Sequence, residues 1–451
     1  KTAITKNIKP KQFVDEVCES FSSLTKTLNL SNDDFIRTTE YRHRQAVSYF
    51  WQQLQARGYI YESTYAGWYA IRDEAYYTES ELVDGKASTG AAVEWVEEPC
   101  YFFALSKFEQ KLLDYYANNP DFIYPKSRYN EVVSFVKSGL KDLSISRTTF
   151  AWGIPVPDSD SHVIYVWLDA LTNYLTVLGY PNNDQKLQDF WPATHIVGKD
   201  ILRFHAVYWP AMLMALDIEL PQQIVAHGWW TNEGEKISKS LGNTIDPVKL
   251  TEQYGVDQVR YFLMREMPFG QDGNFSKSAF IARINSELAN KLGNLAMRSL
   301  SMIVKHFKQQ LPEANYHQPP ALHQTAIDCC QKLSGIIAKP QFAEYLEQVM
   351  ILVDQANSFI DSEAPWQYKK SDPAKMGQIL YEIAETLRYI AVMLLPFMPE
   401  SMHKLLDQLA VSNDLRNFAA LTPAQRLKCG QQLPVPTAIF PRIVNAQAVG
   451  T

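Results

Sequence analysis

The clearest chemistry in the sequence lies in a short segment with two lysines and two serines, Glu235-Lys-Ile-Ser-Lys-Ser-Leu-Gly-Asn243. Lys236 and Lys239 can bring two ammonium groups to one polyphosphate, and glycines on both sides let the backbone bend. Such a loop can close on a triphosphate as charge moves to departing pyrophosphate, which stabilises the transition state selectively. A solvated surface turn is the alternative, because lysine and serine are common in turns. The position of this lysine loop (residues 235–243), after a predicted strand and His227-Gly228, favours phosphate chemistry.

Two further stretches place aromatic side chains on one face of a helix. The first has the spacing i, i+3, i+4 and i+7, and the second has the spacing i, i+4 and i+8. Their members are Trp167, Ala170, Leu171 and Tyr174, and then Ile201, His205 and Trp209. If the two faces converge, they form a deep aromatic pocket with one polar ring, which suits a flexible thioether. Ordinary core is the alternative, since aromatic stripes at helical spacing are usually buried and a lone histidine among them is usually hydrogen-bonded.

These residues follow the elements of a predicted α/β fold. Buried strands are predicted at residues 162–167, 193–198 and 223–228, and helical stretches separate them. This alternation predicts a doubly wound parallel sheet, in which ligands bind at the carboxyl ends of the strands. Upstream, residues 1–57 read as helical, 59–105 as strands and 105–135 as helical. Residues 276–410 read as a helix bundle, hence a separate domain, and the segment after residue 434 reads as loosely structured.

Composition sets wider limits on the class of protein. The chain has 451 residues, 46% of them hydrophobic, which predicts two or three domains. No apolar run reaches the roughly 18 residues that a membrane helix needs, and no signal peptide opens the chain. Five cysteines without a Cys-x-x-Cys pair indicate a reducing compartment and no metal site. We therefore expect a cytoplasmic protein with no membrane partner, and the net charge of −6 does not exclude nucleic acid.

A basic helix is predicted over residues 291–311, which contain four basic residues and no acid. Its apolar side chains cluster on one side, whereas Lys291, Asn294, Arg298 and Lys305 fall together on the opposite side. Such a polar face can reach unstacked RNA bases and their phosphates. A solvated face of a bundle helix is the alternative explanation.

These motifs together resemble a known enzyme family. The lysine loop resembles the Lys-Met-Ser-Lys-Ser signature of class I aminoacyl-tRNA synthetases, with Ile237 in place of methionine. Further runs resemble the methionyl-tRNA synthetases motif for motif, namely Val166-Trp-Leu-Asp-Ala170, Val197-Gly-Lys-Asp-Ile201, Phe204-His205 and Trp209-Pro210. The resemblance implies that the protein activates L-methionine with ATP and Mg2+ to methionyl-adenylate and transfers it to tRNA(Met). A catalytically incomplete, synthetase-derived tRNA-binding protein is the alternative, and a synthetase for another amino acid is a third hypothesis.

The resemblance also implies roles for individual residues. Lys236 and Lys239 match the catalytic lysines. The residues that match the ATP site are Gly198, Lys199, Asp200, His227, Gly228, Ser238 and Lys239. Those that match the methionine pocket are Trp167, Ala170, Tyr174, Ile201, His205 and Trp209. Asn294, Arg298 and Trp366 match residues that contact the tRNA anticodon, where an exposed indole can stack on a base.

The family pattern finally implies domains and two absences. It assigns residues 1–42 to a remnant of the first half of the Rossmann catalytic domain, 43–160 to a connective insertion, 161–228 to the second half, 229–285 to a lysine-loop and stem-contact region, and 286–451 to a helical anticodon-binding domain with a C-terminal tail. In the slots where many relatives hold zinc stand Ala70, Asp73, Lys86 and Thr89, which cannot form a thiolate site, so no structural zinc is expected. The His-Ile-Gly-His signature of the first strand is not found in the chain, so we expect that part of the sheet to precede Lys1. We expect a monomer, because the family's appended dimerisation domain is not visible.

Overall fold

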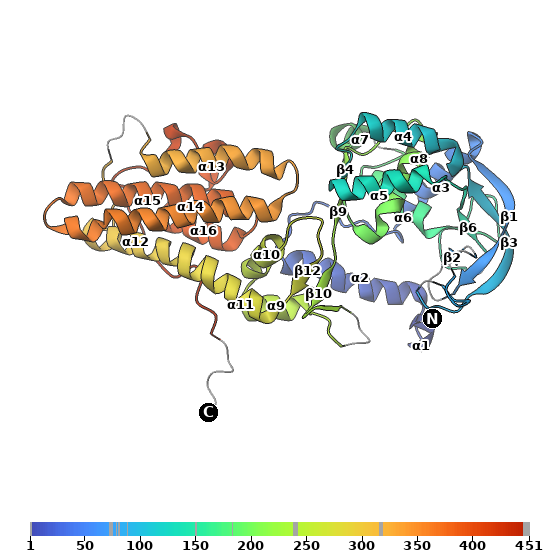
Figure 1. Ribbon diagram of the computed structural model, residues 1–451, viewed down its shortest axis with the longest axis horizontal. Helices are drawn as coiled ribbons and strands as arrows, with labels where there is room; N and C mark the ends of the chain where they lie inside the picture. The colour runs from blue at the N-terminus through green and yellow to red at the C-terminus, as the bar shows by residue number, and fades with distance from the viewer. Residues whose placement is uncertain are drawn as a thin grey trace, which may run out of the picture. The chain divides into compact units, whose positions relative to one another are not determined.

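The computed structural model of the chain describes residues 2–71, 75–77, 79, 82–87, 89–148, 151–182, 184–237, 242–314 and 319–444. The chain forms two compact units, one of residues 33–227 and the other of residues 1–32 together with 228–451 (Figure 1). Among the described residues, no helix is long and apolar enough to cross a membrane.

A three-stranded parallel sheet lies in the unit of residues 33–227, in the order β4–β9–β8. Its strands are β4 (Ile123–Tyr124), β9 (Gln223–His227) and β8 (Thr194–Gly198). The middle residues of β9 are all apolar and buried, as expected for a parallel strand that is covered on both faces. β8 and β9 pair along their whole length, so that Gly198 lies opposite His227 at the carboxyl edge. The predicted parallel α/β sheet is therefore confirmed, and its carboxyl edge lies at these two residues.

The strand predicted at residues 162–167 is wrong in length and in partner. Only β7 (Val163–Ile164) is extended there, and it pairs antiparallel with β6 (Ser146–Arg147). Helix α6 (Val166–Thr176) begins immediately afterwards, because its leucines recur at helical spacing and are buried. The parallel sheet instead takes β4 from residues 105–135, which were predicted as helical; a strand of two residues is too short to leave a period in the sequence.

An antiparallel sheet of four strands accounts for the strand-like pattern of residues 59–105. Its long strands β1 (Ile60–Ala70) and β3 (Glu94–Phe103) pair with each other. β2 (Ala75–Tyr77) and β5 (Leu143–Ser144) complete the order β2–β1–β3–β5.

Helices and short helical segments complete this unit. They are α3 (Tyr41–Ala56), η2 (Leu105–Phe108), α4 (Glu109–Asn118), α5 (Lys126–Lys137), α7 (Asp184–Phe190), η3 (Lys199–Ile201), η4 (Phe204–Tyr208) and α8 (Trp209–Ala215). Their apolar faces form one core with the sheets, which includes the fully buried Phe50, Trp51, Phe103 and Trp209.

The other unit contains a second small sheet, in the order β11–β10–β12. β10 (Trp230–Asn232) pairs antiparallel with β11 (Glu235–Lys236) and parallel with β12 (Gly273–Phe275). Lys236 therefore belongs to a strand, and the lysine loop begins inside this sheet. In the sequence, α9 (Pro247–Tyr254) and α10 (Val256–Arg265) lie between β11 and β12, and α11 (Lys277–Arg283) follows β12.

The helices predicted for residues 276–410 are present and run side by side as a bundle (Figure 1). They are η5 (Ile284–Gly293), a π-helix, and then α12 (Asn294–His306), α13 (Ala321–Ile337), α14 (Phe342–Glu363), α15 (Pro373–Leu394) and α16 (Pro399–Gln408). Every residue of α15 from Ile379 to Leu394 is buried, so this helix is the centre of the bundle. Its start is capped by Asp372, whose carboxylate accepts a hydrogen bond from the Lys375 amide.

Residues 435–444, the described part of the C-terminal tail, form no helix or strand, as expected for a loosely structured tail, but some of them pack on the bundle. Ile439 and Phe440 are buried in the bundle core. The Ile443 amide donates to Asn285 Oδ1 at 2.8 Å, and Asn285 Nδ2 donates to the Ile443 carbonyl at 2.9 Å. Two adjacent apolar residues in an irregular stretch have no periodicity, which is why the sequence did not reveal this packing. The remaining elements of the unit are α1 (Thr2–Thr5), α2 (Pro10–Thr27), η6 (Pro365–Lys369), η7 (Asn413–Leu415), η8 (Phe418–Ala420) and η9 (Pro423–Gln425).

Candidate functional site

The two predicted helical faces meet in an aromatic cluster, which consists of Trp167, Tyr174, His195, Phe204, His205 and Trp209. The Trp167 and Phe204 rings stack at a centroid distance of 3.8 Å, and the Tyr174 and His195 rings stack at the same distance. The His205 ring meets both stacks edge-on, at 6.1 Å from Trp167 and 5.6 Å from Tyr174. α6 and the η3–η4–α8 segment thus bring their ring-bearing residues together, as the spacing predicted.

The hydrogen bonds of His205 fix its tautomer. Its Nδ1 lies 2.9 Å from the Ile201 carbonyl, which can only accept, so Nδ1 carries the proton. Nε2 then accepts the hydrogen bond from Tyr174 Oη at 2.8 Å. His205 stands in the π-helix η4, a rare helical form that is frequent at functional sites. Ile201 contributes its carbonyl, and Ala170 lies on the α6 face between Trp167 and Tyr174.

Burial makes the aromatic cluster electrically neutral. It lowers the pKa of His195 to about 3, with a smaller contribution from the nearby His205. Burial likewise lowers the pKa of His205 and raises the pKa of Tyr174 to about 12. At neutral pH the cluster therefore presents only uncharged rings, with hydrogen bonds among them, to whatever binds there.

Sequence reasoning missed three residues that build this region. His195 and Phe204 each stack on a predicted residue, and His43 from α3 holds α6 in place. His43 Nε2 lies 2.8 Å from Asp169 Oδ1, and its Nδ1 lies 3.0 Å from Thr176 Oγ1. His195 could have been found by its place on a predicted strand. The contact between His43 and α6 spans more than 100 residues of chain and left no local signal.

Residues predicted to bind ATP meet at the carboxyl edge of the parallel sheet. A side-chain carbon at Gly198 would lie 2.6 Å from Asp200 Oδ1 and 3.8 Å from His227 Cε1. A side chain at Gly198 would therefore require the Asp200 carboxylate to move, and the chain turns there into the short helix that contains Lys199 and Asp200. The structure places these four predicted residues beside one another.

The base of the lysine loop is held by backbone contacts in the other unit. A side-chain carbon at Gly228 would lie 2.0 Å from the Gln271 carbonyl, so this position requires glycine. Asn243 Nδ2 donates to the Lys236 carbonyl at 3.1 Å, which ties the two ends of the loop together. Lys236 is exposed, with its Nζ 5.6 Å from the ring centre of Trp229, a cation–π contact. Ser238 and Lys239 lie outside the described residues.

The predicted anticodon residues lie on the surface of the bundle, and we call them the polar bundle face (Asn294, Arg298 and Trp366). Asn294 is exposed, and Arg298 Nη1 pairs with Asp361 Oδ1 at 2.7 Å. Trp366 follows α14 after the left-handed Ala364 (φ 41°), and 47% of it is exposed. Asp361 lies in the last turn of α14, five residues before Trp366 in the sequence.

Two of the positions predicted not to bind zinc, Ala70 and Lys86, take part in apolar packing and backbone pairing. Ala70 is buried in a small cluster with Ala87 and Ala91, and the Lys86 backbone bonds to Val83. Asp73 lies outside the described residues. Within the part of the chain that the structure describes, no three His, Cys, Asp or Glu side chains are grouped so that they could hold a metal ion.

Comparison with known families agrees with this geometry. A family described as "tRNA synthetases class I (M)" matches residues 1–91 and 78–300. A second, described as "Anticodon binding domain of methionyl tRNA ligase", matches residues 340–450. The chain is 56% identical over 451 residues to the methionine–tRNA ligase of Rickettsia conorii, covering 98% of this chain and 88% of that protein. It is 51% identical over 453 residues to the methionine–tRNA ligase of Brucella suis, covering 99% and 88%.

Solved structures give the same result. The methionyl-tRNA synthetase of Mycobacterium tuberculosis bound by methionyl-adenylate superposes with a TM-score of 0.93 at 46% identity, covering 97% of this chain and 89% of that chain. Its apo form superposes with a TM-score of 0.89 at 45% identity, covering 96% and 88%.

Proposed function

Since the chain belongs to the class I methionyl-tRNA synthetase family, we propose that it activates L-methionine with ATP and transfers the methionyl group to tRNA(Met). In the first step a methionine carboxylate oxygen bonds to the α-phosphorus of ATP, and pyrophosphate leaves. In the second step a terminal hydroxyl of the tRNA attacks the methionyl carbonyl, and AMP leaves. The observation that carries the proposal is the close match over nearly the whole chain to a synthetase bound by methionyl-adenylate.

The aromatic cluster is proposed to hold the methionine side chain, with Trp167, Ala170, Tyr174, Ile201, His205 and Trp209 as its binding residues. The neutral state of His195 and His205 supports this role, because an uncharged thioether gains nothing from a nearby ion. Sulfur also packs favourably against ring edges, which this cluster supplies from several directions.

Gly198, Lys199, Asp200, His227 and Gly228 are proposed to bind ATP, together with Ser238 and Lys239 of the lysine loop. The meeting of Gly198, Asp200 and His227 at the sheet edge supports this role, since nucleotides bind outside the carboxyl ends of parallel strands. Lys236 and Lys239 are proposed to stabilise the charge that develops on pyrophosphate, and ATP is taken as its Mg2+ complex. The exposure of Lys236 at the base of the loop supports its access to a bound polyphosphate.

The bundle is proposed to bind the tRNA anticodon through Asn294, Arg298 and Trp366. The exposed Trp366 indole supports base stacking, and the surface position of the Arg298 guanidinium, which pairs with Asp361, supports a contact with RNA. We further propose the domain roles given for residues 1–42, 43–160, 161–228, 229–285 and 286–451, a lobe held by packing rather than zinc, a monomer, and a cytoplasmic location. Metal analysis of the purified protein and its sedimentation test the zinc and monomer proposals.

Methionine-dependent exchange of pyrophosphate into ATP tests the function. The chain is expected to support exchange with methionine but not with leucine or cysteine, and to charge tRNA(Met). Lys239→Ala is expected to abolish exchange while methionine still binds. If the purified chain binds tRNA but shows no exchange, the alternative of a catalytically incomplete tRNA-binding protein holds instead. Exchange with another amino acid would contradict the proposed substrate.

A further inference from the structure

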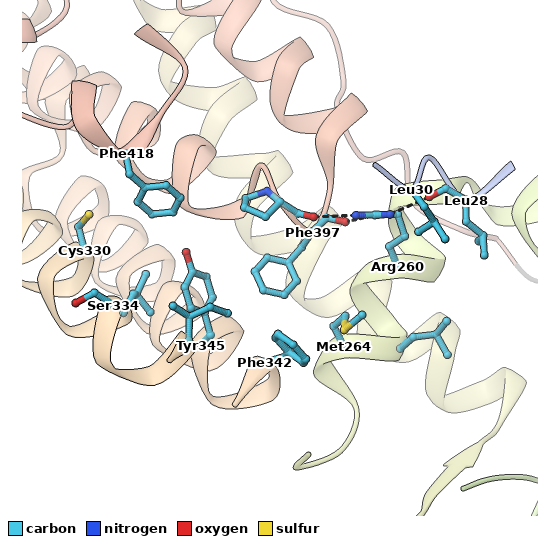
Figure 2. A pocket seen from close by; sticks show the side chains of 14 residues that line it. Leu28, Leu30, Arg260, Met264, Cys330, Ser334, Phe342, Tyr345, Phe397 and Phe418 are labelled. Atoms are coloured by element: carbon cyan, nitrogen blue, oxygen red, sulfur yellow. Dashed lines mark hydrogen bonds between the residues drawn. The ribbon is translucent and has the colours of Figure 1, made fainter. Parts of the chain in front are cut away.

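One arginine on α10 donates to four backbone carbonyls in two distant segments. Arg260 Nε donates to the Phe397 carbonyl at 2.9 Å, and its Nη2 donates to the Pro396 carbonyl at 2.8 Å. Its Nη1 donates to the Leu28 and Asn29 carbonyls, at 2.8 and 3.1 Å. Figure 2 shows the guanidinium between these two segments, which follow α15 and α2.

Electrostatics strengthens this arrangement. The last carbonyls of a helix have no partner within the helix and carry the negative end of its dipole. Leu28 is the C-cap residue of α2, so Arg260 places a positive charge at the C-terminal end of this 18-residue helix. Pro396 and Phe397 lie past Leu395, the C-cap residue of α15, in the turn that leads to α16. Burial lowers the pKa of Arg260, and the nearby Asp257 opposes that shift.

Asp257, three residues before Arg260 on α10, contacts the start of α16, the helix that follows the Pro396–Phe397 segment. Its Oδ2 accepts a hydrogen bond from the Ser401 amide at 2.5 Å, and its side chain is buried. Ser401 is the third residue of α16, so the carboxylate caps the start of that helix. One face of α10 thus binds the segment after α15 and the beginning of α16.

The opposite face of α10 contacts the sheet that carries the lysine loop. The Phe262 ring lies 6.1 Å from Trp230 on β10 and 5.7 Å from Phe275 on β12. β10 pairs directly with β11, which contains Lys236. A continuous path of contacts therefore runs from the base of the lysine loop, through α10, to the turn between α15 and α16.

Apolar packing beside this path is incomplete. A cavity of about 640 Å³ lies between α10, α13 and α14, with Arg260 in its wall. Figure 2 shows Met264, Phe342, Tyr345 and Phe397 around it.

We propose that Arg260 is a positioning residue, which with Asp257 fixes the α15–α16 turn of the bundle against the sheet that carries the lysine loop. Charging of tRNA requires that the bundle and the reacting groups keep a fixed relative position, so it then depends on Arg260. Formation of methionyl-adenylate does not. This inference rests on the proposed function of the chain.

The test uses Arg260→Gln in the full chain. Glutamine keeps a donor but loses the charge and most of the four hydrogen bonds. The kcat/KM for tRNA(Met) charging is expected to fall about tenfold, within the range typical of coupling between sites. Pyrophosphate exchange is expected to stay within about twofold of wild type. Arg260→Lys, which restores a cation at this position, is expected to recover part of the charging activity.

Arg416→Gln is the matched control. Arg416 also donates to backbone carbonyls, those of Val411 and His403, but these belong to α16 and to the segment directly after it. This control is expected to lose thermal stability without a specific loss of charging. The proposal is overturned if Arg260→Gln charges tRNA like wild type, or if its exchange and charging fall in parallel. Should Arg260→Gln not fold, Arg260→Lys and Asp257→Asn face the same two criteria. Failure of wild-type exchange contradicts the proposed function instead.

Discussion

The aromatic cluster and the polar bundle face place their candidate binding residues in opposite physical settings. In the cluster, Trp209 is fully buried and His205 nearly so, and their neighbours are rings and hydrogen bonds. On the bundle face, Trp366 is half exposed and Arg298 is paired with a carboxylate at the surface. The cluster is part of a hydrophobic core, whereas the bundle face projects from a core that is complete without it.

This difference fits the two proposed ligands. A small neutral side chain is selected by shape and by the exclusion of charge, which requires buried, fixed rings. A polyanion is attracted by charge, and its bases stack on side chains that solvent can reach. Substitutions in the cluster should therefore damage fold and function together, and those on the bundle face should damage function alone.

Trp209→Ala is expected to have the largest effect. Truncation of a fully buried tryptophan leaves a cavity and costs about 3–5 kcal/mol of folding free energy. Urea unfolding measures this loss, and methionine-dependent exchange should fall with it. The control is Trp152→Ala in the same unit, where the tryptophan is 45% exposed; it should change stability by only about 0.5 kcal/mol or less. Equal losses in both variants would contradict the assignment of Trp209 to the core.

Trp366→Ala tests whether the polar bundle face acts in tRNA charging without supporting the fold. Loss of one base stack is worth about 1–3 kcal/mol, so kcat/KM for tRNA charging should fall by about 5- to 150-fold. The free energy of unfolding should change by about 0.5 kcal/mol or less, because the indole is exposed. Pyrophosphate exchange should persist. A parallel loss of exchange and charging would show that Trp366 does not act through tRNA.

The stability of the aromatic cluster should depend on pH through His195. Its folded pKa, about 3, lies below the ordinary value of 6.5, so the unfolded chain takes up a proton first as the pH falls. Stability from this group is therefore full above pH 6.5 and is lost between pH 6.5 and 3, by about 2 kcal/mol at pH 5. Urea unfolding at pH 7 and pH 5 measures the loss, and His195→Gln should reduce it. An unchanged pH dependence in that variant would rule out His195 as its source.

Tyr174→Phe tests a single hydrogen bond inside the aromatic cluster. It keeps the ring that stacks on His195 but leaves Nε2 of His205 without its donor. An unsatisfied buried acceptor costs about 1–3 kcal/mol, and the KM for methionine should rise with it. Tyr129→Phe is the control, since Tyr129 Oη donates to the Tyr116 carbonyl in the same unit. If both variants raise the KM for methionine equally, Tyr174 has no special place in the binding site.

Much of the fold and of the candidate site could be predicted from local patterns. The bundle helices and strands β8 and β9 have apolar residues at their own periods, and the aromatic residues of α6 and η4 share a face for the same reason. The sequence did not predict that a side chain at Gly228 would collide with the Gln271 backbone. The prediction was wrong for β7 and β4, because strands of two residues have no detectable period.

The identity of the chemistry was available in the amino-acid sequence, because it depends on residue types at short spacing, such as the lysine loop and the run from Val166 to Ala170. The contacts that hold those motifs in place became visible only in three dimensions. Three contacts join segments far apart in the chain: His43 of α3 with Asp169 of α6, the ring of Tyr174 with that of His195, and Arg260 with the segments that follow α2 and α15. Such contacts depend on which elements pack against each other. The period of apolar residues within one strand or helix identifies its buried face but not its partner.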